Sequence, residues 1–264
     1  MRAGSPSSEA ADKLQRSAEL IFKHWTLALP TAVASVLVVL VAVFGALTVA
    51  AGTFAGSLAA GHLGAGVGFG SALLVAIVAL GIAVAALWFA HAMVVAAAPD
   101  VLADREPNLG AAAAVVFARA PELVAAFLIF LVLAVVPLAL CIVLIGFPLL
   151  IALGYFLMYV PAAIVIGGEG ALQAIGTSVR LARSRAGESV IAWIGLVIAS
   201  VVGVVVNGVV SHIPLVNVVV AFGVGGFVAA YDALVLADFY LWLRLPAAPP
   251  AGVDPIGGAP TVLR

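Results

Sequence analysis

The chain has 264 residues, of which 66% are hydrophobic and 9% are charged, and its mean hydropathy is +1.32. A soluble globular domain carries about 25% charged residues, so this composition excludes that class and indicates a membrane protein. The net charge of −1 argues against a nucleic-acid partner, which needs a basic face, and the single cysteine, Cys141, excludes an intrachain disulfide.

Three long blocks of the sequence almost lack charge. Residues 27–98 and 123–168 contain no Asp, Glu, Lys or Arg, and residues 189–243 contain only Asp232 and Asp238. A helix needs roughly 20 apolar residues to cross about 30 Å of hydrocarbon, so each block fits two crossings and a turn. The predicted fold is therefore all-α, a polytopic membrane protein with six transmembrane helices arranged as three hairpins. The predicted spans are 28–51, 71–97, 122–145, 147–167, 189–211 and 215–241.

An amphipathic segment precedes the first block. Leu14, Ala18, Ile21 and Trp25 follow the i, i+4, i+7 spacing of one helix face, and charged residues lie between them. Such a helix can lie in the headgroup layer of a membrane. The polar leader is too long for a signal peptide, so the first span is predicted to be retained. Residues 1–10 are expected to be disordered, and the membrane domain is expected to occupy residues 11–245.

The turn of the first predicted hairpin is rich in glycine, with the sequence GHLGAGVGFG at residues 61–70. A phosphate-binding loop is not indicated, because the stretch has no G-x-G-x-x-G pattern, no G-K-[ST] and no basic residue. Residues 52–70 are predicted to form a plain outer loop with an early start of the second helix. A partly re-entrant segment is the alternative.

Two later segments parallel the N-terminal helix. Residues 106–120 and 169–186 both open with the pattern E-x-x-L-x-A, and each leads into the next predicted span. The chain is thus predicted to repeat one unit three times, a cytoplasmic interfacial helix followed by a membrane hairpin. Simple cytoplasmic connectors are the alternative. Pro137 and Pro161 lie inside predicted spans and are expected to kink them.

The basic residues predict the orientation. All of them lie outside the three blocks or at their rims, and the turns within the three hairpins contain none. The positive-inside rule then places both termini and the charged connections in the cytoplasm, with the protein in the cell (plasma) membrane. Residues 246–264 contain several prolines and are expected to form a disordered cytoplasmic tail.

Asp232 and His91 are the candidate intramembrane polar site. An acid within the bilayer costs about 2.5–3.5 kcal/mol on insertion scales, so it usually faces a cavity or a partner. His91 lies at a comparable depth, and the two form a titratable pair if their helices touch. The alternatives are an acid near the rim of the membrane and a hydrogen-bonded structural histidine.

Other candidates lie at the rim and along the last hairpin. Arg180, Arg183 and Arg185 are candidate contacts for lipid headgroups. Small and amide residues form stripes on the last two spans, which favour close helix packing. The packing residues are Gly195, Ala199, Gly203, Asn207, Asn217, Ala221 and Gly225. No catalytic motif, metal-ligand spacing or cofactor motif is present, so no metal, no cofactor and no enzymatic activity are predicted.

A short motif lies between the fourth and fifth predicted spans. Glu169, Ala174, Ser178 and Leu181 form the pattern E-x4-A-x3-S-x2-L, and the last span closes with Tyr-Leu-Trp-Leu-Arg at 240–244. Over roughly residues 10–245, these features resemble a broad bacterial group of membrane proteins. That group includes the membrane domain attached to some glycerophosphoryl diester phosphodiesterases and stand-alone six-span relatives of unknown function. The resemblance implies a bacterial inner-membrane architecture. It does not imply hydrolase activity, because the His-Arg-Gly start of the catalytic domain is missing.

Three functions are consistent with this sequence. The first is a non-enzymatic scaffold, partner-binding or lipid-organising component of the membrane. The second is a transporter or channel for a small solute, lipid or ion that uses Asp232, and the third is a membrane-embedded enzyme acting on lipids. Membrane lipids are the expected partners, together with a protein partner or a second copy of the chain.

Overall fold

The computed structural model describes residues 6–59, 61–210, 212 and 214–244, and within these residues the regular structure is entirely helical. The helices are α1 (Pro6–Lys23), α2 (Ala28–Ala59), α3 (Gly61–Leu102), α4 (Leu109–Ala118), α5 (Ala120–Leu140), α6 (Gly146–Leu157), α7 (Val160–Val165), α8 (Ala171–Ser184), α9 (Ala186–Val210) and α10 (Pro214–Arg244), with short 3-10 turns at Trp25–Leu27 and Cys141–Val143.

Six helical stretches are long and apolar enough to cross a membrane, which confirms the all-α polytopic fold. They are Trp25–Thr48, Ile77–Leu102, Ala120–Leu140, Gly146–Val165, Ala186–Val209 and Phe222–Arg244. The chain is therefore a multi-pass membrane protein, because helices satisfy their own backbone hydrogen bonds in lipid. The expected pairing is also confirmed: α2 packs on α3, α5 on α6 and α9 on α10.

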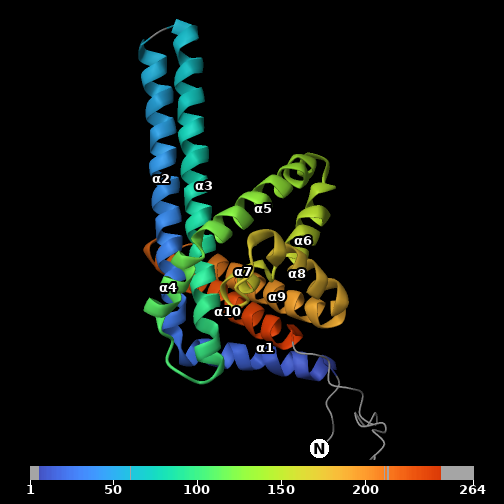
Figure 1. Ribbon diagram of the computed structural model, residues 1–264. Coiled ribbons are helices and arrows are strands. Elements are labelled where there is room, and N and C mark those ends of the chain that lie inside the picture. The colour runs from blue at the N-terminus through green and yellow to red at the C-terminus, as the bar shows by residue number, and fades with distance from the viewer. Residues whose placement is uncertain (1–5, 60, 211, 213, 245–264) are drawn as a thin grey trace, which may run out of the picture.

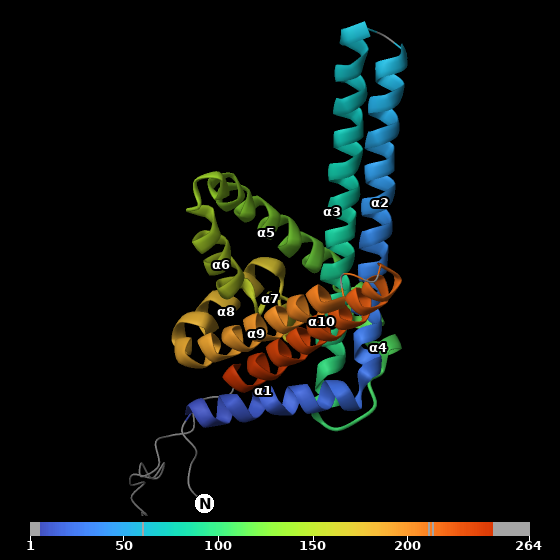
Figure 2. The ribbon, with the colours of Figure 1, turned by 180° about the vertical axis from the view of Figure 1, so that it is seen from behind.

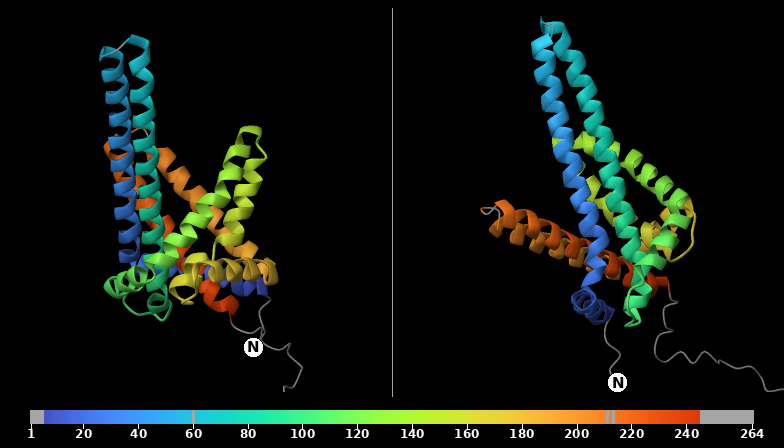
Figure 3. Two further views of the ribbon diagram at one scale, coloured as in Figure 1. Left: turned by 45° about the horizontal axis from the view of Figure 1, so that its top comes forward. Right: turned by 90° about the vertical axis from the view of Figure 1, so that its left-hand side faces the viewer.

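The three hairpins share a base and diverge from it (Figure 1). The α5–α6 and α9–α10 hairpins leave the α2–α3 hairpin in different directions, as the right-hand view of Figure 3 shows. Helix α1 lies across the foot of this arrangement, alongside α10 (Figure 2). Helix α10 is central, because it contacts α1, α2, α3, α7 and α9. The buried core lies at the base, where Val94, Leu123, Ile164 and Tyr240 are enclosed.

The glycine-rich turn differs from its prediction. Helix α2 continues to Ala59 and α3 begins at Gly61, so the expected loop over residues 52–70 is wrong and most of that stretch is helical. Glycine is common in membrane helices, and there the cost of leaving backbone groups unpaired favours continued helix.

Each hairpin is preceded by a short helix, as the threefold plan predicts: α1, α4 and α8 precede α2, α5 and α9. Helices α1 and α8 are amphipathic, whereas α4 is apolar on all sides. Helix α4 begins where the Asn108 side chain accepts a hydrogen bond from the Ala111 N–H at 2.9 Å. Residues 6–10, which were expected to be disordered, belong to α1, whereas residues 1–5 and the expected tail 246–264 lie outside the described residues.

The fourth span is broken into α6 and α7. Pro161 lacks an N–H group, so the carbonyl of Leu157 loses its helical donor and the helix is interrupted. Ser178 of α8 occupies the break: its hydroxyl donates to the Phe156 carbonyl at 2.7 Å and accepts from the Tyr159 N–H at 3.2 Å. The break therefore fixes α8 against the fourth span. Pro137, by contrast, lies within the continuous helix α5.

Candidate functional site

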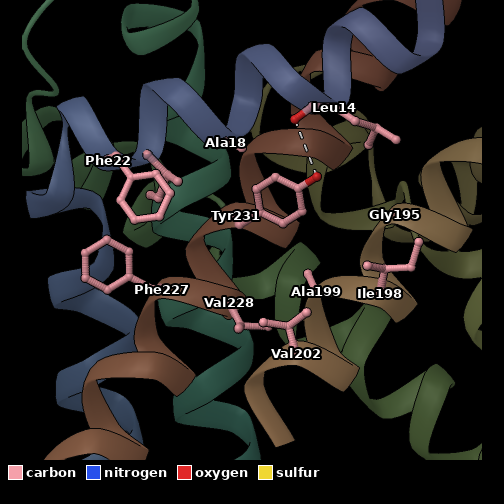
Figure 4. A pocket seen from close by; sticks show the side chains of 11 residues that line it. Leu14, Ala18, Phe22, Gly195, Ile198, Ala199, Val202, Phe227, Val228 and Tyr231 are labelled. Atoms are coloured by element: carbon pink, nitrogen blue, oxygen red, sulfur yellow. Dashed lines mark hydrogen bonds between the residues drawn. The ribbon is translucent and has the colours of Figure 1, made fainter. Parts of the chain in front are cut away.

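An apolar groove lies between α1 and the α9–α10 hairpin (Figure 4). We call it the α1 groove. Its volume is about 440 Å³, which lies within the usual range for small-molecule sites. The lining residues are Leu14, Ala18, Ile21, Phe22, Gly195, Ile198, Ala199, Val202, Phe227, Val228 and Tyr231. Because its walls are apolar, the groove can accept an apolar chain.

Local contacts keep the groove apolar. The Tyr231 hydroxyl, the one side-chain polar group in its lining, points to the Leu14 carbonyl at 3.5 Å (Figure 4). Gly195 lets α1 approach, because an added Cβ there would lie 2.7 Å from Leu14 Cδ2. Lys13 and Asp238 form a largely buried ion pair at 2.9 Å, with the ammonium 5.3 Å from the Trp242 ring centre. Helix α1 is thus attached to α9 and α10 by both packing and charge.

The predicted packing stripe has more than one partner. Gly203 lies against Val228 of α10, as expected for the hairpin, but Gly195 contacts Leu14 of α1 and Ala199 lines the α1 groove. Gly225 has open space around it, and Asn207 has a buried side-chain oxygen without a described hydrogen-bond partner. The side chains of Asn217 and Ala221 lie outside the described residues.

Gly226, the residue after Gly225, makes a close contact with α2 that the predicted packing stripe did not include. An added Cβ there would lie 3.1 Å from the Ala28 carbonyl oxygen, and the Thr31 hydroxyl donates to the Gly226 carbonyl at 2.9 Å.

Asp232 lies on the side of α10 that faces α9. It lines a second groove of about 420 Å³ whose other lining residues, apart from Ser200 and Trp193, are aliphatic. Its Oδ1 atom is buried and has no described hydrogen-bond partner, so it makes no hydrogen bond to His91. The His91 ring lies against the main chain of α10 at Ala229, within one turn of Asp232. Both residues therefore lie where α3 and α10 pack together, but no hydrogen bond between them is described.

The three arginines of the α8 segment do not converge on one ligand. Arg180 donates to the Thr177 hydroxyl at 3.1 Å, and Arg183 lies 5.7 Å from the Phe156 ring centre. Arg185 pairs with Glu188 at 3.5 Å. Arg180 and Arg183 are exposed, so each can meet a headgroup separately.

A second basic cluster was not predicted. It surrounds the turn that follows α7, and we call it the α7 turn site: Arg119, Gly167, Gly168, Glu169, Tyr240 and Arg244. Residues from three parts of the chain meet there, so no local sequence pattern reports it. The sequence linked Glu169 and Tyr240 only to a family resemblance, and both are buried. Ala174, Ser178 and Leu181 of the same motif are buried too, which gives that motif a packing role in this chain.

One exposed ion pair joins α1 to the connection after α3. Lys23 lies 2.6 Å from Asp104. The hydrogen bond from the Lys23 ammonium, and to a smaller extent its charge, lowers the pKa of the Asp104 carboxyl below its usual value of 3.8.

No group of three metal-ligating side chains occurs among the described residues. Comparisons of the chain with protein-family models, curated proteins and solved structures find no match.

Proposed function

We propose that this protein is a lipid-organising component of the cell membrane that holds a lipid acyl chain in the α1 groove, without catalysing a reaction. Both termini lie in the cytoplasm in this proposal, because the basic residues gather on that side. The family resemblance to bacterial six-span proteins agrees with an inner-membrane location. The observation that carries the proposal is the α1 groove itself.

The chemistry of the groove selects its occupant. Every side chain in the lining except Tyr231 is apolar, and the Tyr231 hydroxyl is directed to the Leu14 carbonyl. A polar solute would find no hydrogen-bonding partner there, and burying a polar group without one costs several kcal/mol. The bilayer supplies acyl chains at high concentration at this depth, so an acyl chain fits the groove best.

The position of α1 gives the groove a membrane boundary. Leu14, Ala18 and Ile21 face the groove, while Gln15, Arg16 and other polar residues occupy the opposite side of the helix. An amphipathic helix of this kind lies in the headgroup layer, with its apolar side towards the acyl chains. A lipid in the groove would therefore have its headgroup beside α1 and its chain between α9 and α10.

Native mass spectrometry of the detergent-purified protein tests this proposal. Val202→Trp places a large ring in the groove, and Val209→Trp is the matched control, because Val209 lies on the same helix, is 74% exposed and does not line the groove. We expect the wild type and Val209→Trp to retain a lipid that Val202→Trp loses. Equal lipid retention by all three proteins would reject the α1 groove as a lipid site.

Asp232 supports a second candidate, transport of a small solute or ion. Its buried carboxylate oxygen has no described hydrogen-bond partner and lies beside a groove between two membrane spans. An ionisable side chain in such a place is a candidate for a role in transport. Asp232→Asn preserves the shape of the side chain and removes its charge. Flux into proteoliposomes that is lost in this variant would favour transport, and flux that is absent from the wild type or unchanged in the variant would remove Asp232 from the mechanism.

A further inference from the structure

The α7 turn site is built around two glycines. The chain leaves α7 with Gly168 in the left-handed conformation at φ +69°, and the Gly168 N–H donates to the Ile164 carbonyl at 3.1 Å. The missing side chains leave room for two guanidinium groups. An added Cβ would lie 3.2 Å from Arg119 Nη2 at Gly168, and 3.2 Å from Arg244 Nη1 at Gly167. The two arginines therefore approach consecutive residues of one turn.

The charges of the α7 turn site are not balanced. Glu169 pairs with Arg244 at 3.5 Å, whereas the guanidinium of Arg119 has no hydrogen bond or ion pair to any residue that the structure describes. The cluster thus carries one excess positive charge. Tyr240 is 0% exposed, and its hydroxyl lacks a hydrogen-bond partner among the described atoms. Native structures rarely leave such a group unpaired without a water molecule or ion beside it.

The residues of the site also lie at the ends of three candidate membrane spans. Arg119 immediately precedes the span Ala120–Leu140, Gly167 follows the span Gly146–Val165, and Arg244 ends the span Phe222–Arg244. A planar guanidinium donates two parallel hydrogen bonds to phosphate, and such charge-assisted bonds are stronger than neutral ones. From the free donors, the excess charge and this position, we propose that the α7 turn site binds a phosphate group, presented by a phospholipid headgroup.

This site is separate from the α1 groove. The groove is lined by residues of α1, α9 and the middle of α10, whereas the α7 turn site uses Arg119, the α7 turn and the end of α10. The phosphate proposal therefore does not depend on acyl-chain binding in the groove. Arg119 and Val202 variants distinguish the two sites.

The experiment measures phosphatidylglycerol retained by the delipidated, detergent-purified full chain in native mass spectrometry. Arg119→Gln removes the unpaired guanidinium. Arg105→Gln is the matched control, because it removes the same charge from an exposed arginine, in the connection after α3, that pairs with Asp100. We expect Arg119→Gln to weaken phosphatidylglycerol binding about tenfold to hundredfold, as the loss of a charged hydrogen bond implies, with Arg105→Gln close to wild type. Diacylglycerol, which lacks phosphate, is expected to show no difference between these proteins.

Two further measurements sharpen the result. Displacement of phosphatidylglycerol by inorganic phosphate would identify the free anion as a sufficient ligand, and retention of the lipid would show that its headgroup and chains are needed together. An Arg119→Gln protein that binds phosphatidylglycerol as the wild type does would overturn the proposal. A lower Tm for Arg119→Gln without lost lipid binding would also overturn it, since Arg119 would then only stabilise the end of α7. Equal weakening of lipid binding by Arg105→Gln would overturn it as well.

Discussion

Ser178→Ala is expected to destabilise the protein although it removes one oxygen atom. The Ser178 hydroxyl is fully buried, and it donates to the Phe156 carbonyl and accepts from the Tyr159 N–H at the break in the fourth span. Alanine fills nearly the same space, so little packing is lost. The carbonyl and the N–H are both left without their partner inside the protein.

The magnitude follows from those two groups. A buried polar group that loses its hydrogen-bond partner costs about 1–3 kcal/mol, so the two together predict a loss of about 2–4 kcal/mol in the free energy of unfolding, since some relaxation is available. Each kcal/mol shifts Tm by about 2–4 °C in a chain of 150–250 residues. The expected fall in Tm is therefore about 4–16 °C.

Thermal unfolding in detergent, followed by the loss of the monodisperse peak in size-exclusion chromatography, measures this shift. Ser184→Ala is the control, because Ser184 is exposed at the end of the same helix. A Tm for Ser178→Ala within about 1 °C of the wild type and the control would refute the reasoning. It would show that the break between α6 and α7 is stable without the α8 hydroxyl.

Three further predictions follow from other contacts. Gly226→Val adds a side chain 3.1 Å from a main-chain oxygen of α2, and such overpacking is expected to lower stability by about 1–3 kcal/mol in the same thermal assay; an unchanged Tm would contradict the close crossing. Because its pKa lies below 3.8, Asp104 contributes its ion pair above that pH, and the contribution is lost as the pH falls through the lower folded pKa. An NMR titration of Asp104 in Lys23→Met should therefore move its midpoint up towards 3.8, and no movement would reject the pair. In a cysteine-free background, an impermeant maleimide should label Ser184→Cys only from the cytoplasmic side and Ile142→Cys only from the outer side; the reverse would overturn the orientation.

The spans were predictable because their signal is local. Long stretches without charge identify the membrane segments whatever their tertiary contacts, so all six expected spans match helices of the structure. The interruption at Pro161 was also predictable from the sequence, since proline acts on its own helix. The glycine-rich turn was not, because a local preference for turns was outweighed by helix continuation on both sides of residue 60.

The sites depend on contacts between distant parts of the chain. Gly195 belongs to a small-residue stripe on α9, but no pattern within that helix says that Leu14 of α1 covers it. Arg119 and Arg244 meet at one turn although four membrane spans separate them in the sequence. That Arg244 is paired and Arg119 is unpaired can be seen only in the assembled structure of the hairpins.

The central position of α10 has a consequence for biosynthesis. Helix α10 is the last helix of the described chain, yet α1, α2 and α3 all pack against it. About 140 residues separate the end of α3 from the end of α10, and at 5–20 residues per second their synthesis takes about 7–28 s. During that interval the first hairpin sits in the bilayer without its principal neighbour. The surfaces of α2 that α10 covers, such as the one around Thr31, stay uncovered until the final helix emerges, and a chain that stops before α10 would leave them exposed.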